Sequence, residues 1–227
     1  MKAYYEDELV TLYHGDALEV QAWQDADVLV TDPPYGIAWK GVANYAKGNG
    51  ERKTANKWSD GIANDETANI RDEVLRRWGT KPAIVFGSWK VPRPTGTVHR
   101  LIWHKRGMAP GPAKAPFMTQ DEEIYVLGSG FVATSPPLRS VISTDEARHM
   151  EVGKIGHPTP KPVGLMEILV ARCPDGIIAD PFAGSGATLI AARNLGRQVI
   201  GVELDEGYCE IIAKRLSQQA FDFGILA

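Results

Sequence analysis

Residues 27–35, which read DVLVTDPPY, decide the fold. The apolar run 28–30 is typical of a strand that is buried on both faces of a sheet. That strand must end at Thr31 or Asp32, because the two prolines that follow cannot donate hydrogen bonds to a neighbouring strand. A carboxylate, two rigid prolines and an aromatic ring then lie at the carboxyl end of a strand, where open α/β sheets bind ligands. By itself the tetrapeptide is equally compatible with a plain turn between strand and helix.

The length and composition are those of a globular protein. With 227 residues the chain can bury one substantial core. No apolar run approaches the ~20 residues that a membrane span needs, and the acidic start has no apolar signal core, so we expect no membrane partner. Cys173 and Cys209 lack metal-ligand neighbours and a disulfide framework. We therefore expect no metal site and a reducing cytoplasm.

The charges are unevenly distributed along the chain. The net charge is −3, yet residues 74–120 contain no Asp or Glu and many Lys and Arg. A segregated basic face is typical of a surface that binds phosphates, although a merely solvated face has the same composition. The polar segment 36–65 adds Trp39, Tyr45 and Trp58 among its lysines. Long segments of this kind are usually functional or mobile, and aromatic residues among basic ones suit nucleic-acid contact.

Hydrophobic periodicity predicts an alternation of strands and helices. The expected strands are at 9–13, 28–32, 83–86, 97–104, 123–127, 176–180 and 198–204. The expected helices are a brief one around 18–23, then 65–78, 163–172, 187–195 and a closing helix through 208–216. Residues 105–119 read as a loop, and 131–156 show no clear period.

A glycine-rich turn follows one of the late strands. Residues 180–188 read DPFAGSGAT, and such a turn lets a ligand approach the backbone and its free amide groups. The next strand ends in Glu203, about twenty residues on, where a carboxylate can accept both hydroxyls of a ribose. This pattern indicates a nucleoside cofactor on a Rossmann-like half, although glycine turns also serve packing. It is not GxGxxG, which disfavours a dinucleotide.

Four motifs in one order carry a family resemblance. They are TDPPY at 31–35, HPTPKP at 157–162, DPFAGSGAT at 180–188 and GVELD at 201–205. Together they resemble the amino-methyltransferases of DNA, and the position of the catalytic motif before the cofactor motif resembles the permuted β-class. The resemblance implies a seven-stranded, Rossmann-like α/β fold, S-adenosylmethionine as cofactor, DNA as partner and a bacterial or phage-encoded cytoplasmic protein. Relatives often form homodimers, so a homodimer is possible here.

The resemblance also assigns roles to residues and segments. The whole chain, 1–227, is one methyltransferase domain, with 36–65 as a mobile DNA-contacting loop and 105–156 as a small target-recognition insertion. The residues it implies as catalytic are Asp32, Pro33, Pro34 and Tyr35. Those implied to bind the cofactor are Asp16, Ala17, Asp32, Thr159, Lys161, Pro162, Asp180, Pro181, Phe182, Gly184, Ser185, Gly186, Thr188, Glu203 and Leu204. Lys40, Lys105 and Arg106 are expected to contact DNA.

The chemistry of the DPPY motif follows from the nature of the acceptor. An exocyclic amine on a nucleobase is a poor nucleophile, because its lone pair is delocalised into the ring. Asp32 and the Pro33 carbonyl could accept the two N–H groups, localise the lone pair and stabilise the positive charge that develops. Tyr35 would stack on a base flipped out of the duplex.

The first residue of the motif bears on the choice of base. In the family, DPPY goes with adenine N6 and SPPY more with cytosine N4, so Asp32 favours adenine. Cytosine N4, an RNA substrate and a non-catalytic DNA-binding protein stay open as alternatives. Two departures from the family pattern are Pro160 in place of a glutamine, and Asp121-Glu122 in place of a His-Glu pair. The second leaves the role of that pair open.

Overall fold

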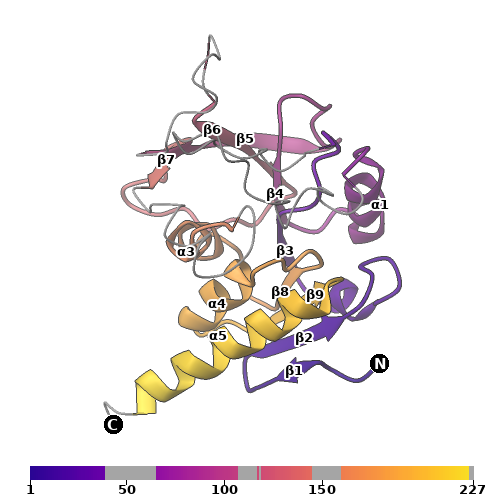
Figure 1. Cartoon of the computed structure of the whole chain (residues 1–227). Helices are drawn as coiled ribbons and strands as arrows, with labels where there is room; N and C mark the ends of the chain where they lie inside the picture. Colours follow the sequence, from indigo (N-terminus) through magenta and orange to yellow (C-terminus); the bar gives the residue numbers. More distant parts are fainter. Residues whose placement is uncertain (39–64, 107–116, 118, 145–159, 225–227) are drawn as a thin grey trace, which may run out of the picture.

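The computed structural model of the chain (Figure 1) describes residues 1–38, 65–106, 117, 119–144 and 160–224. Most of the predicted loop at 36–65 and parts of the segment 105–156 lie outside these residues. Lys40 and Thr159 also lie outside them. Within the described part of the chain, no helix is long and apolar enough to cross a membrane.

One mixed sheet organises the described residues. Its strands are β1 (Tyr5–Glu6), β2 (Val10–His14), β3 (Val28–Thr31), β4 (Ala83–Gly87), β5 (Thr97–Lys105), β6 (Asp121–Leu127), β7 (Val141–Thr144), β8 (Ile178–Asp180) and β9 (Val199–Glu203). Their order across the sheet is β1-β2-β9-β8-β3-β4-β6-β5-β7. The central strands β2, β9, β8, β3 and β4 are parallel, whereas β1 and β6 run antiparallel to their neighbours.

The expectation of seven strands is wrong by two, because the described residues form a nine-stranded sheet. All seven predicted strands are present, and β1 and β7 extend the sheet at its two outer edges. β1 has only two residues, and β7 lies in a stretch without apolar alternation. Edge strands as short as these are selected by the neighbour they pair with rather than by a hydrophobic period.

Helices cover both faces of the sheet (Figure 1). They are the 3₁₀ helix η1 (Ala22–Asp25), α1 (Asn69–Trp78), α3 (Val163–Val170), α4 (Ala187–Asn194) and α5 (Glu206–Gly224). The brief helix expected around 18–23 is thus a single 3₁₀ turn, and α1 begins four residues later than expected, at Asn69 rather than at 65. The predicted helices at 163–172 and 187–195 are confirmed, with slightly earlier ends.

Strand β3 is fixed between two apolar layers. Val28 and Val30 pack in the cluster that contains residues of α3, α4 and α5, whereas Leu29 packs in the cluster around Trp23 and Trp78. The rings of Trp23 and Trp78 are stacked, with centroids 6.0 Å apart. Because burial on both faces leaves β3 little freedom, the residue that follows it is held firmly relative to the sheet.

Candidate active site

Four neighbouring parallel strands lead into carboxylates at the same edge of the sheet. Asp16 follows β2, Glu203 ends β9, Asp180 ends β8 and Asp32 follows β3. Because these strands are adjacent in the order β2-β9-β8-β3, the carboxylates form a row along the carboxyl edge. Open α/β sheets bind ligands at this edge, where connections leave two neighbouring strands in opposite directions. Here that point lies between β8, which continues to β9, and β3, which continues to β4.

The glycine-rich turn between β8 and α4 is shaped by backbone that L side chains rarely adopt. Gly184 and Gly186 have φ of 53° and 82°. A Cβ on Gly186 would lie 2.8 Å from the Ile212 side chain of α5. The turn therefore requires glycine for conformation and for close packing. The Gly184 amide donates to Glu203 Oε2 at 2.7 Å, which joins the turn to the end of β9.

Asp180 holds the turn in place. Its Oδ1 accepts hydrogen bonds from the Thr31 hydroxyl at 2.6 Å and from the Phe182 amide at 3.1 Å. Burial raises the pKa of Asp180 to about 6, although hydrogen bonds from Thr188 and Thr31 oppose the shift. Thr188 and Ser185 are also buried, so we interpret them as residues that stabilise the turn rather than as an exposed binding surface.

Glu203 ends β9, and Asp16 lies two residues beyond the end of the neighbouring strand β2. Burial raises the pKa of Glu203 to about 7, against hydrogen bonds from the Asp205 and Gly184 amides. The Gly15 amide donates to the Glu203 carbonyl at 2.9 Å, and Asp16 Oδ1 accepts from the Leu18 amide at 2.7 Å. Leu204, the residue after Glu203, is about half exposed. A carboxylate held by backbone amides beside an open glycine turn can accept the two hydroxyls of a ribose.

The other end of the row is a cluster of charged side chains and one tyrosine around Asp32. The Tyr35 hydroxyl lies 2.8 Å from both Asp32 Oδ1 and Glu122 Oε2. Lys161 forms an ion pair with Asp32 Oδ2 and lies 3.2 Å from Glu122 Oε2. Lys105 pairs with Glu122 Oε1. We call these five residues the Asp32 network.

The charges of the Asp32 network balance one another. Burial raises the pKa of Asp32, against the attraction of Lys161 and with the repulsion of Glu122. Burial also raises the pKa of Glu122, but Lys161 and Lys105 together lower it to about 2. Burial, with the two neighbouring carboxylates, raises the pKa of Tyr35 well above its usual value. Tyr35 is therefore a neutral hydrogen-bond donor between two carboxylates.

Lys161 directly precedes Pro162, the N-cap residue of α3, and its side chain extends into this cluster. Its side chain is 6% exposed, and its ammonium lies 4.9 Å from the ring centre of Phe86 and 5.6 Å from that of Tyr35. A buried ammonium keeps its charge only where carboxylates and aromatic faces replace water. Lys161 is thus held inside the site rather than solvated.

Sequence reasoning missed Glu122. The acidic pair at the start of β6 had no assigned role, and the sequence does not reveal which of its members faces the site. The sheet register decides this, because Glu122 and Ile124 lie on the face that α3 covers, while Glu123 lies on the other. Lys105, expected to contact DNA, is 8% exposed and belongs to the Asp32 network, so that role stays a prediction.

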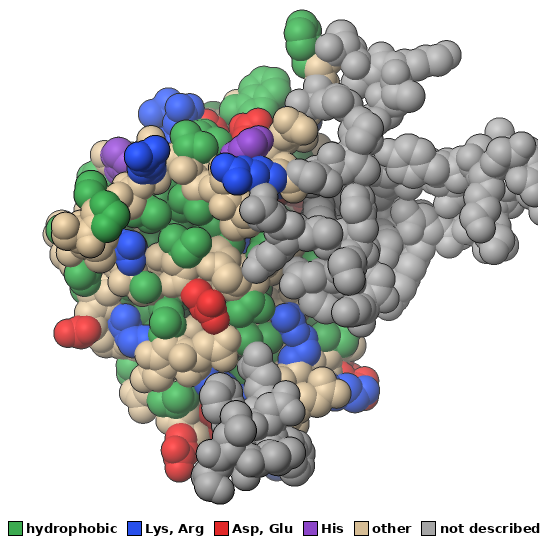
Figure 2. Space-filling view, turned by 90° about the vertical axis from the view of Figure 1, so that its left-hand side faces the viewer, with side chains coloured by type: hydrophobic (Ala, Val, Ile, Leu, Met, Phe, Trp, Pro, Cys, Tyr) green, Lys and Arg blue, Asp and Glu red, His purple; other side chains and the backbone are tan. Residues whose placement is uncertain are grey.

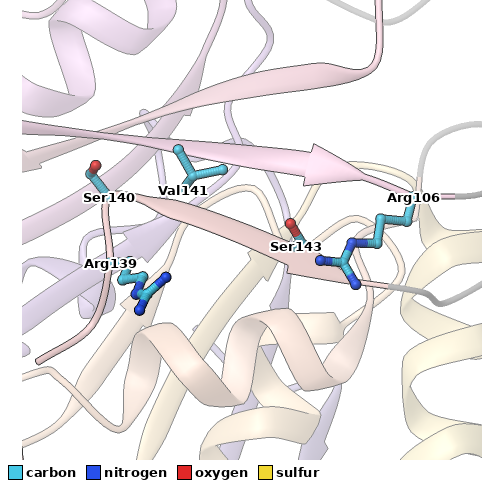
Figure 3. A pocket seen from close by; sticks show the side chains of 5 residues that line it. All are labelled: Arg106, Arg139, Ser140, Val141 and Ser143. Atoms are coloured by element: carbon cyan, nitrogen blue, oxygen red, sulfur yellow. The ribbon is translucent and has the colours of Figure 1, made fainter. Parts of the chain in front are cut away.

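A hollow lies beside β7, at the outer end of the sheet (Figure 3). It has a volume of about 750 Å³ and is lined by Arg106, Arg139, Ser140, Val141 and Ser143. The two guanidinium groups approach it from opposite ends of β7. Figure 2, which views this side of the molecule, shows Lys and Arg side chains across its upper part. Arg106 directly follows Lys105 in the sequence, so one residue of the hollow is the chain neighbour of a residue of the Asp32 network.

Comparison with known proteins identifies the family. The family model described as DNA methylase, for N6 and N4 methyltransferases, matches residues 88–214, more than half of the chain. The type II methyltransferase M.ScaI of Streptomyces caespitosus is 26% identical over an alignment of 262 residues. That alignment covers 96% of this chain and 85% of M.ScaI.

Two solved structures share the fold. The M1.HpyAVI–SAM complex superposes with a TM-score of 0.65 at 22% identity, covering 92% of this chain and 99% of the other. The PvuII DNA methyltransferase, described as cytosine-N4-specific, gives a TM-score of 0.66 at 16% identity, covering 93% and 88%.

The site fits the cofactor of these enzymes. S-adenosylmethionine carries an adenine, a ribose with two free hydroxyls and a sulfonium cation. Glu203 offers a carboxylate beside an open backbone turn, and the row from Asp16 to Asp32 places further negative charge on both sides of it. The family match and this edge of the sheet agree: the chain belongs to the DNA methylase family and is a DNA amino-methyltransferase that uses S-adenosylmethionine.

Proposed function

We propose that this enzyme methylates the exocyclic N6 amine of adenine in DNA. The observation that carries the proposal is the position of Asp32, which directly follows β3 and lies beside the glycine turn through the Thr31–Asp180 hydrogen bond. In the proposed arrangement, this carboxylate would lie next to the methyl donor. Asp32 rather than serine as the first residue of the motif favours adenine.

The row of carboxylates supports one orientation of the cofactor. Asp16 and Ala17 would contact the adenine, with Leu204 beside it, and Glu203 would accept the ribose hydroxyls. Residues 180–186 would pass under the nucleoside, and Lys161 and Pro162 would flank the methionine end. When bound in this way, S-adenosylmethionine supplies an electrophilic methyl group. The orientation directs that group toward Asp32, because Asp32 stands at the β3 end of the row.

The chain's own residues would then prepare the acceptor. Asp32 and the Pro33 carbonyl would accept the two N–H groups of the amine, which favours a pyramidal nitrogen. Pro34 would fix the direction of that carbonyl. Tyr35 would stack on the base, and its hydroxyl, held by Asp32 and Glu122, would fix the plane of the ring. Preorganisation of this kind accounts for most of the rate enhancement that such sites give.

DNA contact is proposed at the hollow beside β7. Arg106 and Arg139 suit phosphate oxygens, and the hydroxyls of Ser140 and Ser143 can add neutral hydrogen bonds. The hollow is lined by no acidic side chain among the described residues. The segments 36–65 and 105–156, with Lys40 and Lys105, are proposed to complete this surface, and a homodimer is proposed as a further source of contacts.

The function is tested by the product. The protein is incubated with S-adenosylmethionine and mixed-sequence duplex DNA, the DNA is digested, and methylated nucleosides are identified by mass. We expect N6-methyladenine from the wild type and a loss of roughly a thousandfold or more in Asp32→Ala. N4-methylcytosine would establish the second candidate, which the fold shared with a cytosine-N4-specific enzyme supports. No methylated base would contradict both.

The DNA surface is tested by salt dependence. Each phosphate contact contributes about one unit to the slope of log affinity against log salt. We expect Arg139→Ala to reduce the slope by roughly one unit without changing turnover at saturating DNA. The matched control is Arg76→Ala, since Arg76 is exposed on α1 and paired with Glu73. Equal slopes in the wild type and Arg139→Ala would remove the hollow from the DNA surface.

A further inference from the structure

Both oxygens of Asp32 already have partners. Oδ1 accepts the Tyr35 hydroxyl at 2.8 Å, and Oδ2 is paired with the Lys161 ammonium. Each carboxylate oxygen can accept two hydrogen bonds, so an amine that binds to Asp32 either shares these oxygens with the two donors or displaces one of them. A displaced ammonium in a buried site needs another carboxylate, because an unpaired charge there is strongly unfavourable.

One atom of the site can receive both donors. Glu122 Oε2 lies 2.8 Å from the Tyr35 hydroxyl oxygen and 3.2 Å from Lys161 Nζ. The Tyr35 hydroxyl has a single proton, so it donates to only one of the two carboxylates at a time. Lys161 has three protons and can donate to both. Each donor can thus move from Asp32 to Glu122 without crossing the site.

The fold keeps Glu122 ready for this exchange. Glu122 is opposite Trp103 in the β5–β6 ladder and faces the layer of α3, from which Lys161 enters. Lys105, at the end of β5, pairs with the other oxygen, Oε1, and so holds the carboxylate in a fixed orientation. Oε2 is then directed at Tyr35 and Lys161.

We propose that Glu122 is a positioning residue for methyl transfer, which takes over Lys161 and the Tyr35 hydroxyl when the target amine binds to Asp32. The inference rests on the proposed function of Asp32 and goes beyond it. It assigns a role to the second residue of the Asp121-Glu122 pair, whose role the sequence leaves open. Glu122 does not touch the base; it lets Asp32 exchange a lysine for an amine while every buried charge keeps a partner.

Electrostatics support the same role. The charged and titratable groups that face Glu122 are Lys105 from β5, Lys161 from the start of α3, and Asp32 and Tyr35 from the end of β3. Asp180 accepts a hydrogen bond from Thr31, the residue before Asp32. Burial and, to a smaller degree, the charge of Asp32 raise the pKa of Asp180. The two lysines hold the pKa of Glu122 at about 2 against the effect of burial, so it stays an acceptor at neutral pH.

The experiment compares two adjacent glutamates. Glu122→Gln keeps the shape but removes the charge, so Lys161 would stay on Asp32. Glu123→Gln is the matched control, because Glu123 is also buried but lies on the other face of the sheet, where it forms an ion pair with Arg100 and accepts a hydrogen bond from the Tyr125 hydroxyl. The measurements are single-turnover methylation from pH 5 to 9, affinities for S-adenosylmethionine and DNA, and thermal unfolding.

We expect Glu122→Gln to lower the single-turnover rate roughly 10- to 100-fold, with both affinities little changed. Because the Glu122 charge raises the pKa of Asp32, its removal should also move the acid limb of the rate profile to lower pH. A purely structural role would not move that limb. Glu122→Asp, which keeps the carboxylate, should recover part of the rate, and Glu123→Gln should methylate at the wild-type rate.

The outcomes separate this inference from the proposed function. A wild-type rate in Glu122→Gln, or losses that follow thermal stability equally in both glutamine variants, would overturn the exchange role while leaving Asp32 as the catalytic carboxylate. A wild-type protein that methylates neither base would overturn the proposed function, and the role of Glu122 with it.

Discussion

The two ends of the carboxylate row hold their charges in opposite ways. At the proposed cofactor end, Glu203 and Asp180 are held by backbone amides and hydroxyls, and burial raises their pKa values to about 7 and about 6. At the proposed catalytic end, Asp32 and Glu122 are paired with Lys161 and Lys105. One end therefore leaves negative charge uncompensated by basic side chains among the contacts described, whereas the other is neutralised.

This difference corresponds to what each end would bind under the proposed function. A ligand that brings hydroxyl donors and a sulfonium cation would complete the cofactor end and stabilise its carboxylates in their charged form. The catalytic end would receive a neutral amine that becomes positive only during the reaction. Lys161 and Lys105 offset the repulsion between Asp32 and Glu122 before the base arrives, and in the proposed exchange Lys161 moves to Glu122 when the base binds.

The largest effect should come from Asp32→Asn. We expect methyl transfer to fall by roughly a thousandfold or more, because the amide cannot stabilise the positive charge that develops on the amine. Affinity for S-adenosylmethionine, measured by calorimetry, should change by less than about threefold, since the charge of Glu203 is untouched. An equal loss of affinity and rate would show that the two ends do not act separately.

Glu203→Gln should give the reverse pattern. Losing hydrogen bonds from two hydroxyls to a charged acceptor should weaken cofactor binding about 10- to 100-fold. DNA affinity and the rate at saturating cofactor should stay near their wild-type values. Cofactor affinity that survives this change would place the ribose elsewhere.

The raised pKa of Glu203 predicts a pH dependence for cofactor binding. In the free protein the carboxyl group is partly protonated near pH 7. Hydroxyl donors favour the carboxylate, so binding lowers this pKa and releases a proton. Affinity should therefore rise by at most about tenfold per pH unit up to about pH 7, and level off above it. Calorimetry in buffers of different ionisation enthalpy checks the proton release, and Glu203→Gln should flatten the profile.

A smaller effect on stability should come from the close packing of the glycine-rich turn against α5. Gly186→Ala should destabilise the fold more than Gly196→Ala, by about 1–2 kcal/mol. Both glycines have positive φ, 82° and 67°, but only at Gly186 would a Cβ meet a side chain, 2.8 Å away on Ile212. Thermal unfolding of the two variants measures the difference. Equal stabilities would mean that Ile212 moves aside.

The sequence predicts the centre of this fold better than its edges. Strands β3, β8 and β9 have apolar runs and end in a carboxylate or directly before one, so their positions and the neighbouring motifs could be assigned without coordinates. β1 and β7 lack such runs, and their pairing depends on the neighbours that reach them. The same limit applies to the site: the motifs contain Asp32 and Tyr35, whereas Glu122 enters it through the register of β6.

The order of strands also determines when the active site can form during synthesis. The Thr31–Asp180 hydrogen bond joins residues 149 positions apart, and β2 reaches β3 only through β9 and β8. While a ribosome makes the middle of the chain, β2 and β3 both have unpaired edges, which are prone to associate with other chains. A chain arrested before residue 178 contains the DPPY motif but lacks β8 and β9, the strands that join β3 to β2 and β1. The last strands to be made are thus the ones that close the centre of the enzyme.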